Sequence, residues 1–502
     1  MLDELGKNAR ANVMRSAIPR TLLAALLASA LAACGNQGEE ALDVTVIGTQ
    51  APRLDDPAAA PLSLPSEVLE SSIAQGLVRF DARGQIEPGL AERWNVSDDG
   101  LSYIFRIGSG DWPDGRSINA RDVARILNRQ MRSASRNPLK DTLGAVSEIV
   151  SMTDRVIEIR LRAPRPNLLQ LLAQPQLSII REGQGTGPFR IDTRQDSPGA
   201  MSLSRTIRVI DDKDRIEHAH LRNAGAAEAI ARFRDGKADL VLGGTFVDLP
   251  LVARRERAMR SALHFDPVAG LFGLIPARAG GPLADKQLRS LLNRAINREA
   301  LIAALNVPNL VGRTTILQGG LEGGGNPPPP AWAGIPFQER YPQLIGEAHT
   351  AFGDDRIKVS IQLPDGPGAK IVFARLAADW RPLGIDLAQV SRGLRADLQL
   401  VDLVAPSSSP AWFVRTFRCG IAPICSEDAD KLMEAARTAQ DASQRAAMLL
   451  EAGRILDSED LFFSLAAPIR WSLVGDLPGF SENNFARHPL GGLTEKLSPE
   501  RQ

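Results

Sequence analysis

The chain has 502 residues, of which 44% are hydrophobic and 24% charged, and its 59 basic and 59 acidic side chains cancel. A single hydrophobic core stops growing at roughly 250 to 300 residues, so this length predicts two or three lobes. Nucleic-acid-binding proteins carry a clustered basic excess. The balanced charge, without long runs of one sign, therefore argues against a nucleic-acid partner.

The N-terminal segment 1–33 has the pattern of an export signal. Two arginines precede the apolar run 21–30, which is shorter than the ~20 apolar residues needed to span a bilayer. The following Leu-Ala-Ala-Cys, which ends at Cys34, matches the cleavage box of bacterial lipoproteins. We therefore predict a cleaved signal peptide, a lipid on Cys34 and a polar tether over residues 34–42. The lipid would be the only membrane contact, on the periplasmic side of the bacterial cell envelope.

Two further cysteines, Cys419 and Cys425, form an even pair in a chain predicted to be exported. Disulfides persist in oxidising compartments, so we predict that these two cysteines are joined and close a short loop. Free or metal-bound thiols are the alternative.

The stretch 76–127 shows the clearest local pattern. It predicts an apolar strand at 76–80, an alternating strand at 101–107, three glycine-containing turns, and a helix that begins after Asn119, a residue suited to cap it. Nothing in this stretch indicates catalysis.

The same stretch resembles the signature of the family 5 extracellular solute-binding proteins, the peptide- and nickel-binding receptors of ABC importers. Turn residues and aromatics that keep one order along the chain carry the resemblance: Pro88, Gly89, Leu90, Ala91, Glu92, Trp94, Asp98, Asp99, Gly100, Leu101, Tyr103, Phe105, Trp112, Asp114, Gly115 and Ala120 to Val123. Such a resemblance identifies a scaffold and does not name a ligand.

The resemblance implies an α/β fold of the periplasmic-binding-protein type, with two lobes of mixed sheets joined by a hinge and an extra subdomain, as in type II or cluster C proteins. Lobe I is expected to be discontinuous, with residues 43–75, 183–264 and 475–502. The extra subdomain would comprise residues 76–182, and lobe II residues 265–474.

Later segments extend the resemblance over nearly all of the chain after the signal. Residues 185–189, Gly-Thr-Gly-Pro-Phe, match a turn of the family. A nucleotide-binding loop is not indicated, because neither GxGxxG nor a Lys-Ser/Thr follows the glycines. His218 and His220 alternate on one predicted strand and could bind a metal, although surface histidines are the simpler interpretation; no metal or cofactor is expected.

The resemblance places the end of the first strand, Thr49 and Gln50, at the rim of the ligand cleft, with a plain strand-to-loop turn as the alternative. Many peptide-binding members carry an acidic loop whose aspartate holds the α-ammonium of the ligand. Here the loop 406–413 reads PSSSPAWF and has no acid. Either Asp402 or a serine hydroxyl such as that of Ser408 takes over this role, or the ligand has no free ammonium.

Trp412 and Phe413 are candidate walls of the cleft, with core packing as an equally good alternative, and Phe272 is a further candidate ligand-binding residue. Arg415 is a candidate partner for a carboxylate, with a solvated surface position as the alternative. Ile275 and Pro276 stand where family members usually carry an asparagine, which is a second departure near the cleft.

The leading prediction is a monomeric, lipid-anchored binding protein that closes around a peptide or similar solute and delivers it to an ABC permease and its ATPase. An exported enzyme is the least favoured interpretation, because the chain lacks HExxH and GxSxG and its five histidines have no catalytic spacing. A transport-independent envelope sensor or interaction protein on the same scaffold is the other alternative, motivated by the two departures.

Overall fold

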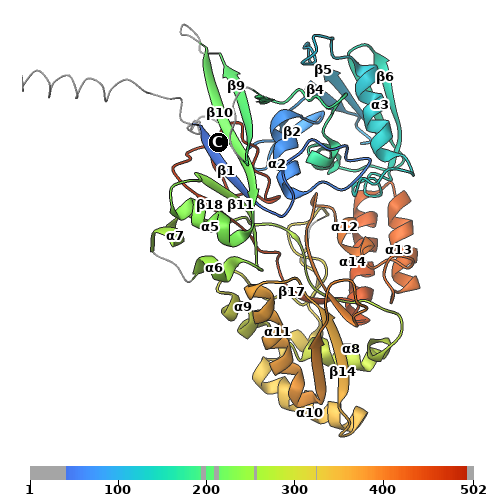
Figure 1. Ribbon diagram of the computed structural model, residues 1–502. Coiled ribbons are helices and arrows are strands. Elements are labelled where there is room, and N and C mark those ends of the chain that lie inside the picture. The colour runs from blue at the N-terminus through green and yellow to red at the C-terminus, as the bar shows by residue number, and fades with distance from the viewer. Residues whose placement is uncertain (1–40, 194–198, 209–213, 254–256, 324, 494–502) are drawn as a thin grey trace, which may run out of the picture.

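The computed structural model describes residues 41–193, 199–208, 214–253, 257–323 and 325–493. The predicted signal peptide and Cys34 lie outside these residues. The described chain contains a seven-stranded, a five-stranded and a four-stranded sheet and a two-stranded hairpin. Figure 1 shows the seven- and four-stranded sheets side by side in the upper half and the five-stranded sheet below them. The expected arrangement of two lobes and an extra subdomain is confirmed.

The seven-stranded sheet forms lobe I, and its central strand β1 (Leu42–Ile47) runs parallel to both of its neighbours. The other strands are β8 (Arg190–Ile191), β9 (Met201–Ile207), β10 (Arg215–Ala224), β11 (Leu240–Thr245), β12 (Leu263–Phe265) and β18 (Arg470–Val474). Side chains alternate between its two faces: Leu240 and Leu242 enter one core, and Val241 enters the other. The helices of this lobe are α2 (Leu64–Ile73), α5 (Ala226–Arg234), α6 (Leu249–Ala253) and α7 (Arg257–Ser261).

The five-stranded sheet forms lobe II in the order β15-β14-β16-β13-β17. Its strands are β13 (Gly270–Pro276), β14 (Ile357–Gln362), β15 (Ile385–Gln389), β16 (Leu398–Val404) and β17 (Phe463–Ala466). One core lies under α8 (Lys286–Arg294), α9 (Arg298–Leu305), α10 (Phe337–Phe352) and α11 (Pro367–Trp380). The opposite face packs on α12 (Pro410–Arg415), α13 (Glu427–Thr438) and α14 (Ala442–Ser458).

The extra subdomain has its own hydrophobic core. It contains the hairpin β2 (Val78–Phe80) and β3 (Ile86–Pro88), the sheet β4 (Ala91–Val96), β5 (Ser102–Ile107), β6 (Val146–Thr153) and β7 (Val156–Leu161), and the helices α3 (Ala120–Met131) and α4 (Leu168–Leu172). The side chain of Asn119 accepts a hydrogen bond from the Asp122 amide, so the predicted cap of α3 is confirmed. Trp112 and Phe105 are buried. The apolar residues of the signature therefore build this core.

The strand β18 corrects one predicted boundary. Residues up to 474 were expected in lobe II, but β18 pairs with β11 and β12 of the lobe I sheet. The Trp471 indole donates a hydrogen bond to the Thr245 carbonyl (2.8 Å) and lies over Gly244, where a Cβ atom would come within 2.0 Å of the ring. Close packing on a glycine thus holds this strand in lobe I.

The Gly-Thr-Gly-Pro turn packs against the C-terminal end of α2. The Gly187 amide donates to the Ile73 carbonyl over 2.9 Å. A Cβ atom on Gly185 would lie 2.3 Å from that carbonyl oxygen, and one on Gly187 would lie 2.6 Å from the carbonyl carbon. The glycines are therefore needed for the close approach of two backbone segments, and the turn is a structural joint.

Cys419 and Cys425 form a disulfide in the segment between α12 and α13, with their sulfur atoms 2.08 Å apart. The pairing expected from the sequence is therefore present in the structure. Among the residues that the structure describes, no helix is both long enough and apolar enough to cross a membrane.

Candidate functional site: a cavity between the lobes

A cavity of about 330 Å³ lies where the sheets of the two lobes meet; we call it the interlobe cavity. The end of β11 and one face of α2 form its lobe I wall, and residues 402–404 of β16 form its lobe II wall. Residues 470–472 of β18 and the C-terminal segment 485–488 complete the lining. Because β18 and β11 reach the junction of the lobes (Figure 1), both lobes contribute to one site.

Asp402 and Arg470 form an ion pair in this lining. The Arg470 Nη1 atom donates to both carboxylate oxygens of Asp402, over 2.8 and 3.1 Å, and Nη2 donates to the Asp402 carbonyl over 3.3 Å. Burial raises the pKa of Asp402, although the guanidinium of Arg470 acts in the opposite direction. The predicted acid therefore lies in the cavity, but its carboxylate is already bound.

The other two acids of the lining are paired as well. Asp266 contacts the His488 ring at 3.1 Å and also accepts a hydrogen bond from the Asn483 amide at 2.9 Å. Glu67 forms an ion pair with Arg487. The interlobe cavity thus holds three acid–base pairs, and a ligand ammonium could reach a carboxylate only by displacing a side chain of the protein.

The part of β16 that lines the interlobe cavity, residues 402–404, lies at an open edge of the strand. The Ala405 amide donates to the Ala269 carbonyl, and the Ala277 amide donates to the Asp397 carbonyl. In this antiparallel pair, the odd-numbered residues of β16 therefore form the hydrogen bonds to β13. The backbone N–H and C=O groups of the even-numbered residues of β16 then point away from β13, toward the edge that β14 occupies. β14 pairs only with Leu398 and Gln399, so this edge continues through residues 400–404 without a paired strand in the described structure.

Two of the predicted cleft residues are core residues. Phe272 is 1% exposed and packs with its ring centroid 4.9 Å from that of Phe246, under the α8–α11 layer. Phe413 is fully buried beneath α12–α14. The alternation along β13 and the apolar face of α12 direct these rings inward. Neither ring lines the interlobe cavity, so their assignment to the cleft is corrected.

The predicted loop residues lie outside the interlobe cavity. The Ser408 amide and hydroxyl donate to the Gln170 side chain over 2.8 and 3.2 Å, which joins the loop to α4 of the extra subdomain. Trp412 and Arg415 line a small pocket of about 40 Å³ against the same subdomain. Thr49 and Gln50 are exposed after β1 and line none of the cavities described for this chain.

The structure adds site residues that sequence reasoning missed. Gly243 and Gly244, which follow an apolar strand, offered a signal, because a glycine pair at a strand end often marks a close approach. Arg470 and Trp471 lie in β18 and were not among the residues that the sequence indicated for the site. Arg487 offered no local signal, since it joins the cavity only through the path of the C-terminal segment.

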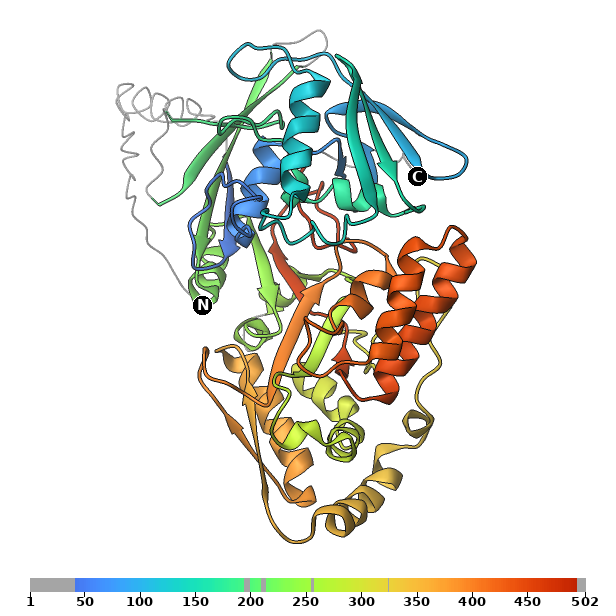
Figure 2. The same cartoon turned by 90° about the vertical axis from the view of Figure 1, so that its right-hand side faces the viewer.

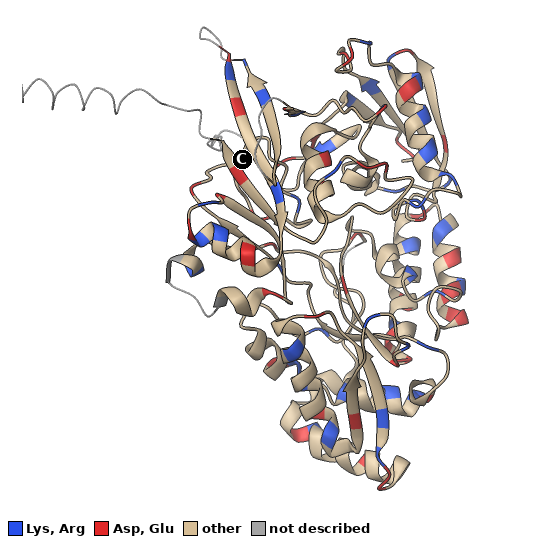
Figure 3. Cartoon of the chain, in the orientation of Figure 1, with Lys and Arg blue, Asp and Glu red and all other residues tan. Residues whose placement is uncertain are grey.

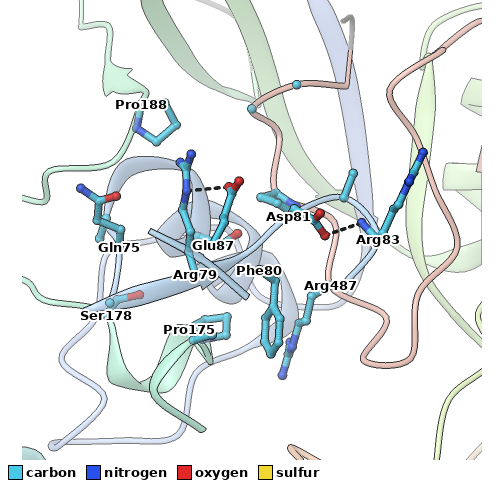
Figure 4. A pocket seen from close by; sticks show the side chains of 18 of the residues that line it. Gln75, Arg79, Phe80, Asp81, Arg83, Glu87, Pro175, Ser178, Pro188 and Arg487 are labelled. Atoms are coloured by element: carbon cyan, nitrogen blue, oxygen red, sulfur yellow. Dashed lines mark hydrogen bonds and ion pairs between the residues drawn. The ribbon is translucent and has the colours of Figure 1, made fainter. Parts of the chain in front are cut away.

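A second cavity of about 440 Å³ adjoins the first and shares Ser71, Pro175 and Arg487 with it. Figure 4 shows that Arg79 and Glu87, from the two strands of the β2–β3 hairpin, point toward each other, with 2.8 Å between Nε and Oε1. Phe80, from the same hairpin, stacks on a ring of the C-terminal segment. This cavity is therefore an extension of the site in which Arg79 and Glu87 are already paired with each other.

The two strand histidines do not form a metal site. His220 lies 3.5 Å from the Asp43 carboxylate. Within the described ranges, no group of three or more His, Cys, Asp or Glu side chains could hold a metal ion.

Two sheet-based lobes around a shared cavity, with a separate subdomain, define the class of periplasmic-binding-protein-like receptors. The family model described as bacterial extracellular solute-binding proteins, family 5 Middle, matches residues 85–392, and the chain belongs to this family.

The chain is similar over most of its length to proteins named for peptide binding. Di/tripeptide-binding protein 1 of Pseudomonas aeruginosa is 23% identical over 513 residues, covering 89% of this chain and 92% of that protein. The solved structure of Haemophilus influenzae OppA in complex with RPPGFSPFR has a TM-score of 0.76 at 17% identity and covers 91% of this chain and 99% of that one. The Escherichia coli murein tripeptide binding protein MppA has a TM-score of 0.74 at 16% identity, with 89% and 97% covered. At these identities the solved structures establish the fold alone.

Proposed function

We propose that this protein is the substrate-binding component of an ABC importer, which takes up a peptide or peptide-like solute in the interlobe cavity and delivers it to a permease and its ATPase. The observation that carries this proposal is the unpaired edge of β16 beside the cavity. An extended peptide adds to such an edge through its main chain, which gives affinity for many sequences. The names of the relatives agree with a peptide ligand. No catalytic role is proposed.

The size and charge of the cavity restrict the ligand. The interlobe cavity and the adjoining cavity, at about 330 and 440 Å³, are in the range of small-molecule sites. All three acids of the interlobe lining are paired with basic side chains, so a free α-ammonium on the ligand would add little to the binding free energy. We expect short peptides whose N-terminus is blocked to bind at least as well as free ones, unless the ligand displaces Arg470 from Asp402.

Delivery to a permease requires that the lobes open and close. Two segments cross between the lobe sheets, 266–269 and 467–469, and they are the proposed hinge. The proposed lobe boundaries follow from them, with lobe II ending before β18. Export, a lipid on Cys34, periplasmic location and a monomeric state complete the proposal; these features rest on the N-terminal sequence pattern and on the family.

The test is calorimetric binding of di- to tetrapeptides, free or N-acetylated, to purified residues 35–502. Val404→Pro removes one main-chain donor from the unpaired edge, whereas the matched control Val404→Ala keeps that donor. Because a hydrogen bond contributes about 1 kcal/mol, we expect Val404→Pro to weaken peptide binding at least about fivefold and Val404→Ala to leave it nearly unchanged.

Equal weakening by both variants would remove the main-chain argument. No binding by any peptide would overturn the peptide proposal and favour the sensor alternative. A selective loss of free-amino peptides in Asp402→Asn would show that Asp402 anchors the ammonium after all.

A further inference from the structure

A third cavity, of about 590 Å³, lies between the extra subdomain and helices α12–α14; we call it the cationic cavity. Figure 2 shows these helices directly below the subdomain, and Figure 3 shows charged residues along them. It shares no lining residue with the interlobe cavity. The charged residues of its lining are Lys140, Arg165, Arg415, Arg418, Arg437 and Arg445, and Asp141, Glu322, Asp430 and Glu434.

Six basic and four acidic side chains leave a surplus of two positive charges in this lining. Three of the four acids are paired with arginines, because Asp141 also lies 3.7 Å from Arg415, whereas one carboxylate oxygen of Asp430 has no hydrogen-bond partner. Glu322 accepts a hydrogen bond from Arg445 Nη2 at 2.8 Å, and Glu434 accepts from Arg437 Nε at 3.0 Å. Asp430 accepts from a backbone amide.

Two of the cations are held by carbonyl oxygens in place of carboxylates. Arg165 donates to the carbonyls of Pro164 (2.7 Å) and Arg437 (2.8 Å). Lys140 Nζ donates to the carbonyls of Ser133 and Ser135. Burial, and next the nearby Arg445, lowers the pKa of Arg165 to about 10. Arg445 and Arg437 act in the same direction as burial, whereas Glu322 opposes them.

Arg445 gives the cavity an unused donor. The residue is 6% exposed, and its Nη1 atom is buried without a hydrogen-bond partner. A buried donor without an acceptor is costly, and one on a charged group costs more than a neutral one. Anions bind guanidinium groups through short, charge-assisted hydrogen bonds. An anion in the cavity would supply the missing acceptor.

Part of the lining is apolar. Val414, Met433, Ala436 and Leu449 contribute side chains from α12, α13 and α14. Sites for small organic molecules combine such a surface with a few polar groups that fix orientation. The cationic cavity therefore suits a molecule with two negative charges and an apolar body better than it suits a bare inorganic ion.

We propose that the cationic cavity is a second binding site, specific for a small organic dianion such as an aromatic dicarboxylate or a phosphomonoester. The anion would bridge Lys140 and Arg165 of the extra subdomain to the arginines of lobe II. This site is independent of the interlobe cavity, so its existence does not rest on the proposed peptide ligand.

The experiment is calorimetry on purified residues 35–502 with phthalate, phenyl phosphate and inorganic phosphate, and with p-xylylenediamine as a ligand of opposite charge. We expect the two organic dianions to bind, with phenyl phosphate at least about tenfold tighter than inorganic phosphate, and the diamine not to bind. Binding should weaken as salt is added, because charges are screened. Phthalate and phenyl phosphate together distinguish a carboxylate preference from a phosphate preference within the proposed class.

Variants locate the site. Arg445→Gln can still donate to Glu322 but loses the guanidinium, and Arg418→Ala removes an exposed lining cation. We expect each variant to weaken phenyl phosphate binding about tenfold. Arg392→Ala, an exposed arginine outside the cavity, is the matched control and should change nothing.

Val404→Pro separates the two proposals, because it should weaken peptide binding and leave dianion binding unchanged. Absence of dianion binding, equal binding of the diamine, equal weakening by Arg392→Ala, or competition between phenyl phosphate and a bound peptide would each overturn the second site.

Discussion

Glu70, on α2, is a carboxyl group that the fold keeps protonated. Its side chain is fully buried; Oε1 accepts a hydrogen bond from the Asp55 amide at 3.2 Å, and Oε2 has no partner. Burial is the main cause that raises the pKa of Glu70 from 4.5 to about 9. Between these two values the folded chain binds a proton that the unfolded chain has released.

The resulting prediction is that the stability contributed by this protonated group is complete below pH 4.5 and is lost as the pH rises toward 9, by about 1.4 kcal/mol per pH unit. Glu70→Gln mimics the protonated acid, so the variant should be more stable than the wild type at pH 8 and similar to it at pH 4.5. Urea unfolding at both pH values measures the difference. The exposed Glu339→Gln is the control, and an unchanged stability at pH 8 in Glu70→Gln would contradict the assignment.

Single residues also show where sequence reasoning succeeds and where it ends. The cap at Asn119 and the cysteine pair were predictable, because each depends on chemistry within a short stretch of chain. Phe272 and Phe413, which were candidates for the cleft, are buried in cores, since an aromatic residue on a predicted element suits a core as well as a cleft. Which face packs inward is decided by the neighbouring elements.

At the scale of elements, the joint between α2 and the Gly-Thr-Gly-Pro turn gives a second prediction. Gly187→Ala would place a Cβ atom 2.6 Å from the Ile73 carbonyl carbon, where neither backbone can move without breaking the Gly187–Ile73 hydrogen bond. We expect a loss of stability of about 3 kcal/mol, in the range of overpacked sites.

Gly346→Ala is the matched control for this joint. Gly346 lies within α10 and has no atom within 4 Å of an added Cβ, so alanine should stabilise the helix by about 0.5 to 1 kcal/mol. Thermal or urea unfolding of the two variants should move in opposite directions. Destabilisation of the same size in both would show that the turn has no special contact with α2.

Elements also explain why the candidate site was only partly foreseen. The sequence identified Asp402 as a candidate anchor, but it did not show that β14 stops pairing at Gln399 and leaves an edge of β16 beside a cavity. Strand lengths and register depend on pairing across more than thirty residues of intervening chain, which local periodicity does not encode. The partner of Asp402, Arg470, comes from a different sheet.

At the scale of the whole molecule, the two-lobed plan was predictable because the signature over 76–127 resembles one family, and its apolar residues build the core of the extra subdomain. The contacts between lobe II and the extra subdomain were not predictable. The loop 406–413, which we call the serine loop, makes hydrogen bonds to the extra subdomain. The Ser408 amide donates to the Gln170 side chain, and the Gln174 side chain donates to the Pro406 carbonyl. The departure from the family pattern therefore has a structural use.

These contacts lead to a last prediction, on the equilibrium between open and closed lobes. Gln170 accepts hydrogen bonds from both the amide and the hydroxyl of Ser408. Gln170→Ala removes them, which should cost the closed arrangement about 1 kcal/mol and shift the open-to-closed ratio about fivefold toward open. Small-angle X-ray scattering of the ligand-free protein should then give a larger radius of gyration than the wild type. Gln338→Ala, an exposed position on α10, should not change it. If the Gln170→Ala variant folds normally and its radius of gyration is unchanged, the serine loop does not govern closure. The motion of the lobes would then depend on the hinge segments alone.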